Sequence, residues 1–276
     1  MTQPIIRFEG VSKSFGAQAV LRDFSLDVAP GAFLTIIGRS GCGKTTALRL
    51  VNGLLTPDAG RVLVQGEDVA GTDPVALRRR IGYAIQSVGL FPHMTVEKNI
   101  AYVPSISGLD GWKGKARREK VSALLARVGL DPALAGRYPR SLSGGQRQRV
   151  GIARALAAGP QILLMDEPFG AVDEITRGQL QGEIRKIHRE SGITILFVTH
   201  DIGEALNLGT RVLVLDQGTV QQCAAPEELL RHPASPFVAR LVEPQRHARL
   251  LPDETRTDHP YTATNIPAAE ERRRSP

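Results

Sequence analysis

The eight residues from Gly38 to Thr45 have the types and spacing that bind phosphate groups. They read Gly-Arg-Ser-Gly-Cys-Gly-Lys-Thr and match the pattern G-x-x-x-x-G-K-[ST] at every position. Glycines let consecutive backbone N–H groups converge on phosphate oxygens, and the first turn of a helix adds positive potential. We expect Lys44 to reach the β- and γ-phosphates of a nucleotide and the Thr45 hydroxyl to ligate Mg²⁺. The simpler alternative is a glycine-rich turn, and Cys42 within it is interpreted as a space-filling residue.

Two carboxylates follow an apolar run at Ile162 to Met165. Asp166, at the end of the predicted strand, would hold Mg²⁺ directly or through water. Glu167 is a candidate general base that polarises the attacking water. Two acids alone would more simply begin a surface loop. Beside a phosphate loop, the functional interpretation is favoured.

A second anion-binding helix end is predicted at Leu142-Ser143-Gly144-Gly145-Gln146. Ser143 can cap a helix that runs to about Leu156, and the two glycines allow an anion to approach its first turn. One nucleotide does not need two such ends on one chain. A head-to-tail dimer would use both, because the phosphate loop of each copy would face the Ser143 helix of the other. The alternative is an ordinary capped helix.

The phosphate loop requires a strand before it and a helix after it, and the sequence supplies both. Short apolar runs bounded by Gly, Pro or Asp alternate with amphipathic stretches, which is typical of a mostly parallel sheet covered by helices on both faces. The predicted strands are Phe33–Ile37, Ile81–Gln86, Ile162–Asp166, Ile193–Thr199, Arg211–Asp216 and Thr219–Gln222. The predicted helices among them are Lys44–Val51, Ile175–Glu190 and Ile202–Leu208.

Composition limits the class of protein. The 276 residues are 42% hydrophobic and carry a net charge of +7, which excludes wholesale disorder and leaves nucleic acid, anionic membranes and anionic ligands as partners. Two cysteines are too few for a disulfide scaffold and are typical of a reducing cytosol. No run approaches the roughly 20 apolar residues that span a bilayer, and the first residues do not form a secretion signal. We therefore expect a soluble or peripheral protein.

The middle and the end of the chain differ from the rest. Between Lys113 and Arg149 helical signals dominate, so this part is predicted to be a helical insertion between two halves of the α/β core. It holds ten basic residues and two acids, a net charge of +8 that exceeds the +7 of the whole chain. This places the excess on one lobe rather than on a diffuse nucleic-acid surface. From Pro244 onward apolar periodicity stops, and residues 244–276 are predicted to be a disordered tail.

Taken together, these segments resemble the nucleotide-binding subunit of an ABC transporter, over roughly residues 4–243. The resemblance implies a P-loop NTPase (RecA-like) α/β core with an antiparallel β-subdomain and an inserted α-helical subdomain at approximately 95–158. It implies ATP and Mg²⁺ as ligands and ATP hydrolysis as the activity. The ATP-binding residues that it implies are Phe15, which would stack on adenine, with Gly38, Arg39, Ser40, Gly41, Cys42, Gly43, Lys44, Thr45 and Thr46.

The resemblance also assigns roles outside the loop. Lys44, Gln86, Glu167 and His200 would be the catalytic residues, with Gln86 as Mg²⁺ and γ-phosphate sensor and His200 as the switch at the γ-phosphate. Thr45, Gln86 and Asp166 would be the Mg²⁺ ligands. Ser143, Gly144, Gly145 and Gln146 would act in trans across a homodimer, and Asp173 would couple its two sites. Each of Phe15, Gln86 and His200 has a purely structural alternative.

A narrower resemblance points to the ATPases of osmoprotectant uptake, which move glycine betaine, choline and related quaternary amines. It is carried by residues 79–93, 99–104 and 154–158. It implies permease subunits docked near Gln86 to Asn99, an extracytoplasmic substrate-binding protein, and a peripheral position at the cytoplasmic face of the bacterial inner membrane. Two departures lie near the expected dimer interface. Val172-Asp173-Glu174 stands where many relatives have Leu-Asp-Pro, and Arg140-Ser141 stands where a His and an acidic or amide residue are more usual.

Two other classes remain as alternatives, besides an importer of another small solute. A DNA-repair or ribosome-associated ATPase of the same fold is disfavoured, because no long coiled coil lies between Gln86 and Ser143 and no second such domain follows. No nucleic-acid partner is therefore expected. A non-hydrolysing nucleotide switch is disfavoured by the presence of both Glu167 and His200.

Overall fold

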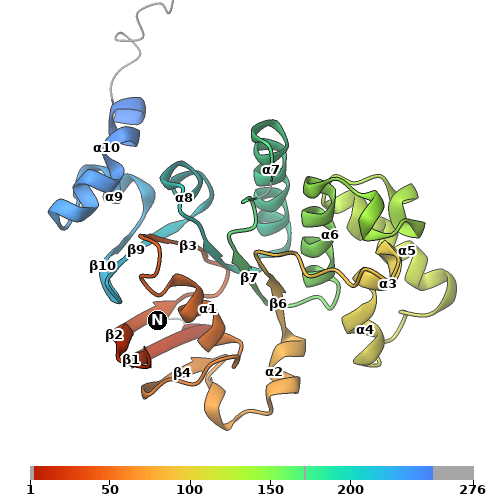
Figure 1. Ribbon diagram of the computed structural model, residues 1–276, viewed down its shortest axis with the longest axis horizontal. Coiled ribbons are helices and arrows are strands. Elements are labelled where there is room, and N and C mark those ends of the chain that lie inside the picture. The colour runs from red at the N-terminus through yellow and green to blue at the C-terminus, as the bar shows by residue number, and fades with distance from the viewer. Residues whose placement is uncertain (1–2, 171, 251–276) are drawn as a thin grey trace, which may run out of the picture.

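The computed structural model describes residues 3–170 and 172–250 (Figure 1). The larger of the two sheets in this part of the chain has the strand order β10-β9-β3-β8-β7-β6. Its neighbours pair in parallel except for the antiparallel hairpin β9–β10. The strands are β3 (Phe33–Gly38), β6 (Ile81–Ala84), β7 (Ile162–Asp166), β8 (Thr194–Val198), β9 (Arg211–Asp216) and β10 (Thr219–Ala224).

The central strands of this sheet are buried on both faces. In β7, Leu163 and Met165 belong to the cluster that includes the helical region, whereas Ile162 and Leu164 belong to the cluster under the smaller sheet. This alternation follows from the two-residue period of a strand. Because β3, β6, β7 and β8 are parallel, their carboxyl ends lie along one edge of the sheet, where ligands of such folds bind.

The smaller sheet is antiparallel, with the order β2-β1-β4-β5. Its strands are β1 (Ile6–Phe15), β2 (Gln18–Val28), β4 (Ala59–Val64) and β5 (Glu67–Asp68). The rings of Phe8 in β1 and Phe24 in β2 pack edge to face, with their centroids 4.9 Å apart. The same core includes Leu48 and Val51 of α1 (Lys44–Val51), so the sheet is anchored to the helix that follows the phosphate loop.

The helical region lies to one side of the larger sheet (Figure 1). It contains α3 (Val96–Ile100), α4 (Tyr102–Ile106), α5 (Gly114–Arg127) and α6 (Gly144–Leu156), with short 3₁₀ turns at Pro132–Gly136 and Pro139–Ser141. Val121 and Leu125 of α5 are fully buried in one cluster with Val150 and Ile152 of α6. Together with the two sheets, this arrangement confirms the predicted α/β fold class.

The remaining helices are α2 (Pro74–Arg80), α7 (Glu174–Ser191), α8 (Ile202–Leu208), α9 (Pro226–Arg231) and α10 (Pro236–Leu250), with a 3₁₀ turn at Val69–Gly71. The prediction of disorder from Pro244 onward is wrong for residues 244–250, which continue α10. Proline removes one helical N–H, but Val238 and Val242 are fully buried in the preceding turns and hold the helix in place. The rest of the predicted tail, 251–276, lies outside the described residues. None of the described helices has the length and apolar character needed to cross a bilayer.

Candidate nucleotide site

The phosphate loop joins β3 to α1 and keeps the first turn of α1 open. The N-cap residue Gly43 has φ 105° and gives no side-chain cap. A Cβ at Gly43 would lie 2.6 Å from a Leu21 methyl carbon and 2.8 Å from the Val20 carbonyl oxygen, so only glycine fits. The Lys44 ammonium donates to the carbonyls of Gly38 (2.8 Å) and Arg39 (2.9 Å). It is therefore held across the loop, where a phosphate charge would lie.

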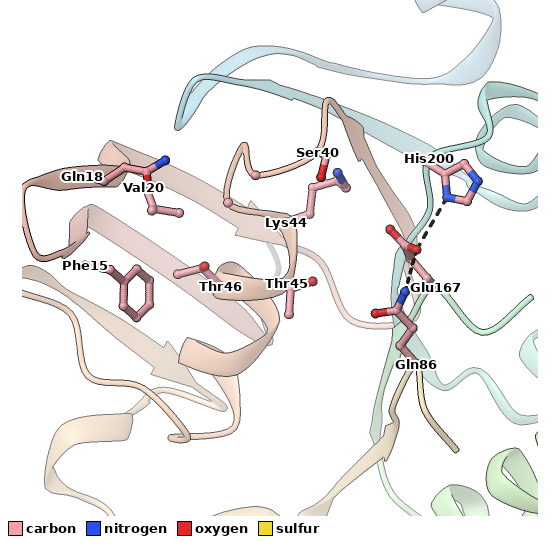
Figure 2. Close-up of a pocket in the computed structure, with 12 residues that line it drawn as sticks. Phe15, Gln18, Val20, Ser40, Lys44, Thr45, Thr46, Gln86, Glu167 and His200 are labelled. Atoms are coloured by element: carbon pink, nitrogen blue, oxygen red, sulfur yellow. Dashed lines mark hydrogen bonds and ion pairs between the residues drawn. The ribbon is translucent and has the colours of Figure 1, made fainter. Parts of the chain in front are cut away.

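A cavity of about 620 Å³ extends over this loop, a volume within the usual range for small-molecule sites. Figure 2 shows Phe15 at one end, Gln86, Glu167 and His200 at the other, and the phosphate loop between them. The cavity is lined by Phe15, Gln18, Val20, Ser40, Gly41, Gly43, Lys44, Thr45, Thr46, Gln86, Glu167 and His200. The structure thus brings together five separate parts of the chain: strands of the smaller sheet, the phosphate loop with the start of α1, and the segments that follow β6, β7 and β8.

The aromatic end of the cavity is formed by the turn between β1 and β2. The Phe15 side chain is on the surface, 48% exposed, which leaves a face of its ring free to stack on a base. Gln18 and Val20 line the cavity beside it and were not singled out from the sequence. The signal that could have identified them is their position at the start of the next strand, two and four residues after Gly16.

Three polar side chains meet at the opposite end, each just after a strand of the larger sheet. The Gln86 amide donates to Glu167 Oε2 (3.1 Å), and His200 Nδ1 lies 3.6 Å from the same oxygen. Glu167 has φ 44°, a left-handed conformation that a non-glycine residue rarely adopts and that functional sites tend to hold. Its carboxylate faces the cavity with one oxygen oriented by both neighbours (Figure 2).

Asp166 and Thr45 form a pair beneath the cavity. The Thr45 hydroxyl donates to Asp166 Oδ1 at 2.9 Å. Burial raises the pKa of Asp166, the Thr45 hydrogen bond opposes this, and the charge of Glu167 adds to it. Adjacent ligands of an octahedral Mg²⁺ with bonds of about 2.1 Å are about 3 Å apart, so the two oxygens fit one edge of such a site. Tyr83, which the sequence did not reveal, also acts to lower the pKa of Asp166, against the effect of burial.

Arg39 and Cys42, two residues of the predicted loop, do not line this cavity. The guanidinium of Arg39 lies 5.0 Å from the centre of the Phe237 ring in α10, away from the cavity lining. Cys42 is buried, and its sulfur lies 4.0 Å from the Lys44 nitrogen. Burial raises the pKa of the Cys42 thiol. A buried thiol with a raised pKa supports the interpretation of Cys42 as space-filling.

The predicted second anion site begins α6 and lies apart from this cavity. Ser143 Oγ accepts from the Gln146 N–H (3.2 Å), and Gln146 Oε1 accepts from the Ser143 N–H (2.9 Å), which completes a capping box. None of the residues 143–146 lines the cavity described above. Asp173 caps α7 by accepting from the Thr176 N–H at 3.0 Å, and this contact lowers the pKa of Asp173.

The family model of the ABC transporter matches residues 21–170, more than half of the chain. A glycine betaine/carnitine/choline transport ATP-binding protein of Bacillus subtilis is 44% identical over 263 residues, covering 95% of this chain and 68% of that protein. A glycine betaine uptake system ATP-binding protein of Escherichia coli is 50% identical over 234 residues, covering 85% and 75%. A sulfate/thiosulfate import ATP-binding protein of Caulobacter vibrioides is 46% identical over 243 residues, covering 86% and 69%.

Among solved structures, the fold is similar to a dimeric ATP-binding cassette in a post-hydrolysis state bound to ADP and phosphate. The TM-score is 0.74 at 31% sequence identity, over 80% of this chain and 98% of the other.

Proposed function

The chain belongs to the ABC transporter family, and on that premise we propose that it is the ATP-hydrolysing subunit of an importer for glycine betaine, choline or related quaternary amines. The activity is supported by the cavity that joins a phosphate loop to Glu167. The solute class is supported by one observation: relatives with these solutes in their names are 43–50% identical over 85–95% of the chain.

ATP binding would begin at the phosphate loop. The ring of Phe15 would stack on adenine, while the backbone of residues 38–46 and the Lys44 ammonium hold the phosphates. Thr45 and Asp166, which are hydrogen-bonded to each other, would hold Mg²⁺ together with Gln86, which lines the cavity. When bound, Mg²⁺ neutralises charge on the β- and γ-phosphate oxygens.

Hydrolysis requires a water in line with the γ-phosphorus, and Glu167 is placed to take its proton. The Gln86 amide occupies one lone pair of Oε2 and fixes the orientation of the carboxylate, which leaves Oε1 for the water. His200, beside the same carboxylate, would donate to a γ-phosphate oxygen as the bond to the leaving ADP breaks. Positioning of the water and neutralisation of charge at the γ-phosphate would account for most of the acceleration of hydrolysis.

A second copy of the chain would complete the site. Ser143 to Gln146 of each copy would face the γ-phosphate bound by the other, and Asp173 would couple the two sites. The separation of α6 from the cavity within one chain supports this proposal, as does the dimeric form of the similar solved structure.

The permease partner would dock beside Gln86. A groove of about 440 Å³, lined by Arg49, Leu54, Leu55, Tyr83, Ile85, Gln86, Ser87 and Asp166, supports this placement. The buried Asn99 bonds the backbone of Phe91 (2.8 Å) and so holds the segment from Gln86 to Asn99 against the helical region. An extracytoplasmic binding protein would supply the solute, and the chain would act at the cytoplasmic face of the inner membrane.

The decisive measurement is ATP turnover of the purified chain and of Glu167→Gln. Loss of the base is expected to slow turnover about 10²- to 10⁴-fold. An ATP-stabilised dimer should accumulate in the variant, as seen by light scattering. Glu190→Gln, which changes an exposed carboxylate near the end of α7, is the matched control. Equal turnover for the wild type and Glu167→Gln would refute the role of the base.

The solute is tested separately, by uptake in a strain that lacks the gene. Labelled glycine betaine, choline and carnitine are each compared with sulfate, because the sulfate/thiosulfate relative is 46% identical. Restored uptake of sulfate alone would support the second candidate, an importer ATPase for another small solute.

A further inference from the structure

The backbone just after Gln86 makes a tight and strained turn. Val88 donates its N–H to Ile85 O (3.1 Å), and Gly89 donates to Ser87 O (2.6 Å), two residues back. Val88 has φ 58° and Gly89 has φ 54°. A positive φ is unfavourable for a β-branched residue, so Val88 needs neighbours that hold it there. The turn also ends β6 at Ala84, two residues before the predicted end of that strand.

Arg154, near the end of α6, holds this turn from outside. Its Nη1 donates to Gly89 O and its Nη2 to Val88 O, both at 2.7 Å. Two parallel bonds from one planar guanidinium fix the orientation of both peptide groups, which a lysine cannot do. The Arg154 side chain is partly buried, and this burial lowers the pKa of its guanidinium.

The same helix makes room for the Val88 side chain. A Cβ at Gly151 would lie 3.0 Å from Val88 Cγ1, so Val88 packs against the bare backbone of α6 one turn before Arg154. The strained residue is thus held by a packing contact and by two hydrogen bonds from a single helix. That helix begins at Ser143, the predicted site of contact with the second nucleotide.

We propose that Arg154 is a positioning residue, which clamps the turn at Val88 and Gly89 and thereby keeps the Gln86 amide on the Glu167 carboxylate. The inference rests on the proposed function, because the clamped amide matters only if Glu167 is the base. It adds a physical link between α6 and the reacting end of the cavity: a shift of α6 moves the two carbonyls, and the turn moves Gln86, which precedes it directly.

Arg78 provides a matched control for this clamp. Its guanidinium also donates to two consecutive carbonyls, Asn52 O (3.1 Å) and Gly53 O (2.7 Å), and Gly53 likewise has a positive φ of 63°. Arg78 therefore makes the same kind of contact at a turn that does not carry Gln86. Arg78→Lys and Arg154→Lys remove the same chemistry from two places.

The clamp is tested first by hydrogen exchange of the full-length chain, which does not depend on catalysis. Arg154→Lys is expected to speed exchange in the peptide spanning residues 85–92, with no change there in Arg78→Lys. Unchanged exchange in Arg154→Lys would refute the clamp.

Its consequence is then read from steady-state ATP hydrolysis. Arg154→Lys should lower kcat about 10-fold and leave KM for ATP within about twofold, because the phosphate loop is untouched. Arg78→Lys should retain the wild-type kcat. Faster exchange with unchanged kcat would refute the positioning role. A wild-type chain without turnover would instead refute the proposed function, and the exchange result would still decide the clamp.

A further variant separates the clamp from general damage to the fold. Val88→Gly removes the conformational strain, because glycine accepts a positive φ. Arg154→Lys should therefore lower kcat by a smaller factor in the Val88→Gly background than in the wild type. An equal loss in both backgrounds would show that Arg154 does not act through the strained turn.

Discussion

Two helices of this chain begin at glycine-rich segments, and their first turns are satisfied in opposite ways. At the start of α1, Gly43 gives no side-chain cap, and the lysine that follows is buried. At the start of α6, Ser143 and Gln146 satisfy each other's N–H groups in a capping box. The first helix end therefore leaves backbone donors for a ligand inside a cavity, whereas the second is already stable without one.

This difference indicates that the two helix ends have different roles in nucleotide binding. The end of α1 can bind phosphate within one chain, because its donors and Lys44 line a single cavity with Phe15. The end of α6 keeps the N–H groups of Gly144 and Gly145 and the Ser143 hydroxyl proton as donors. These become useful only when another chain brings a phosphate to them.

The largest effect is expected from Gly43→Ala. A methyl group at this position would collide with Leu21 and with the Val20 carbonyl, in a conformation that alanine also disfavours. The loop cannot relax without losing its phosphate-binding shape, so ATP affinity should fall at least about 100-fold, equivalent to about 2.7 kcal/mol. Titration calorimetry of the single chain measures this. Affinity within a few fold of wild type would contradict the proposal that α1 binds the nucleotide.

The second effect separates binding from turnover at α6. Ser143→Ala removes a hydroxyl donor and half of the capping box, so turnover should fall about 10²-fold, as for loss of one transition-state donor. Stability should fall by about 1 kcal/mol because of the lost cap. ATP affinity of the single chain should be unchanged. If calorimetry instead shows weaker binding by the monomer, Ser143 acts within its own chain and the shared site is wrong.

The sequence predicts the first helix end better than the other parts of the site because the information is local. The loop and α1 depend on consecutive residues, and the helix was predicted with its observed bounds, Lys44–Val51. The same holds for the cap at Ser143. The end of β7 at Asp166 was predicted as observed, because the apolar run finishes in a polar residue that chemistry can use, whereas β6 and β8 end two residues and one residue before their predicted ends.

Other features depend on contacts that a pattern does not show. Register shifts interrupt the pairing of β1 between Phe8 and Ser14, so its residues do not alternate cleanly, and only the family resemblance implied this sheet. Gln18 and Val20 were missed for the same reason. The turn at Val88 and the continuation of α10 through Pro244 both violate local preferences, and tertiary contacts from Arg154 and Val242 maintain them.

A third effect concerns the charge beneath the phosphate loop. Because burial raises the pKa of Asp166, folding favours its protonated form. Without Mg²⁺ and nucleotide, its contribution to stability is present below the unfolded pKa and is lost as pH rises through the folded pKa. Asp166→Asn should therefore be more thermostable than wild type at neutral pH, and the difference should vanish in acid.

With Mg²⁺-ATP present, the order should reverse, because the variant lacks the anionic ligand. Thermal melts at several pH values, each with and without Mg²⁺-ATP, give both signs. A variant that gains as much from Mg²⁺-ATP as the wild type does would exclude Asp166 as a metal ligand.

The smallest effect is expected from a second glycine-to-alanine substitution. It tests whether loss of ATP affinity follows from replacing any helical glycine or only from replacing one at the start of α1. Gly182 lies inside α7, and a Cβ there would meet no atom within 4 Å. Gly182→Ala should stabilise the chain by about 0.5–1 kcal/mol through helix propensity, with ATP affinity and turnover unchanged. Urea unfolding and calorimetry check both. The substitution is the same as the one at Gly43. If ATP affinity falls in Gly43→Ala and is unchanged in Gly182→Ala, the loss at Gly43 is due to the open first turn of α1. A loss of ATP affinity in Gly182→Ala would remove that attribution.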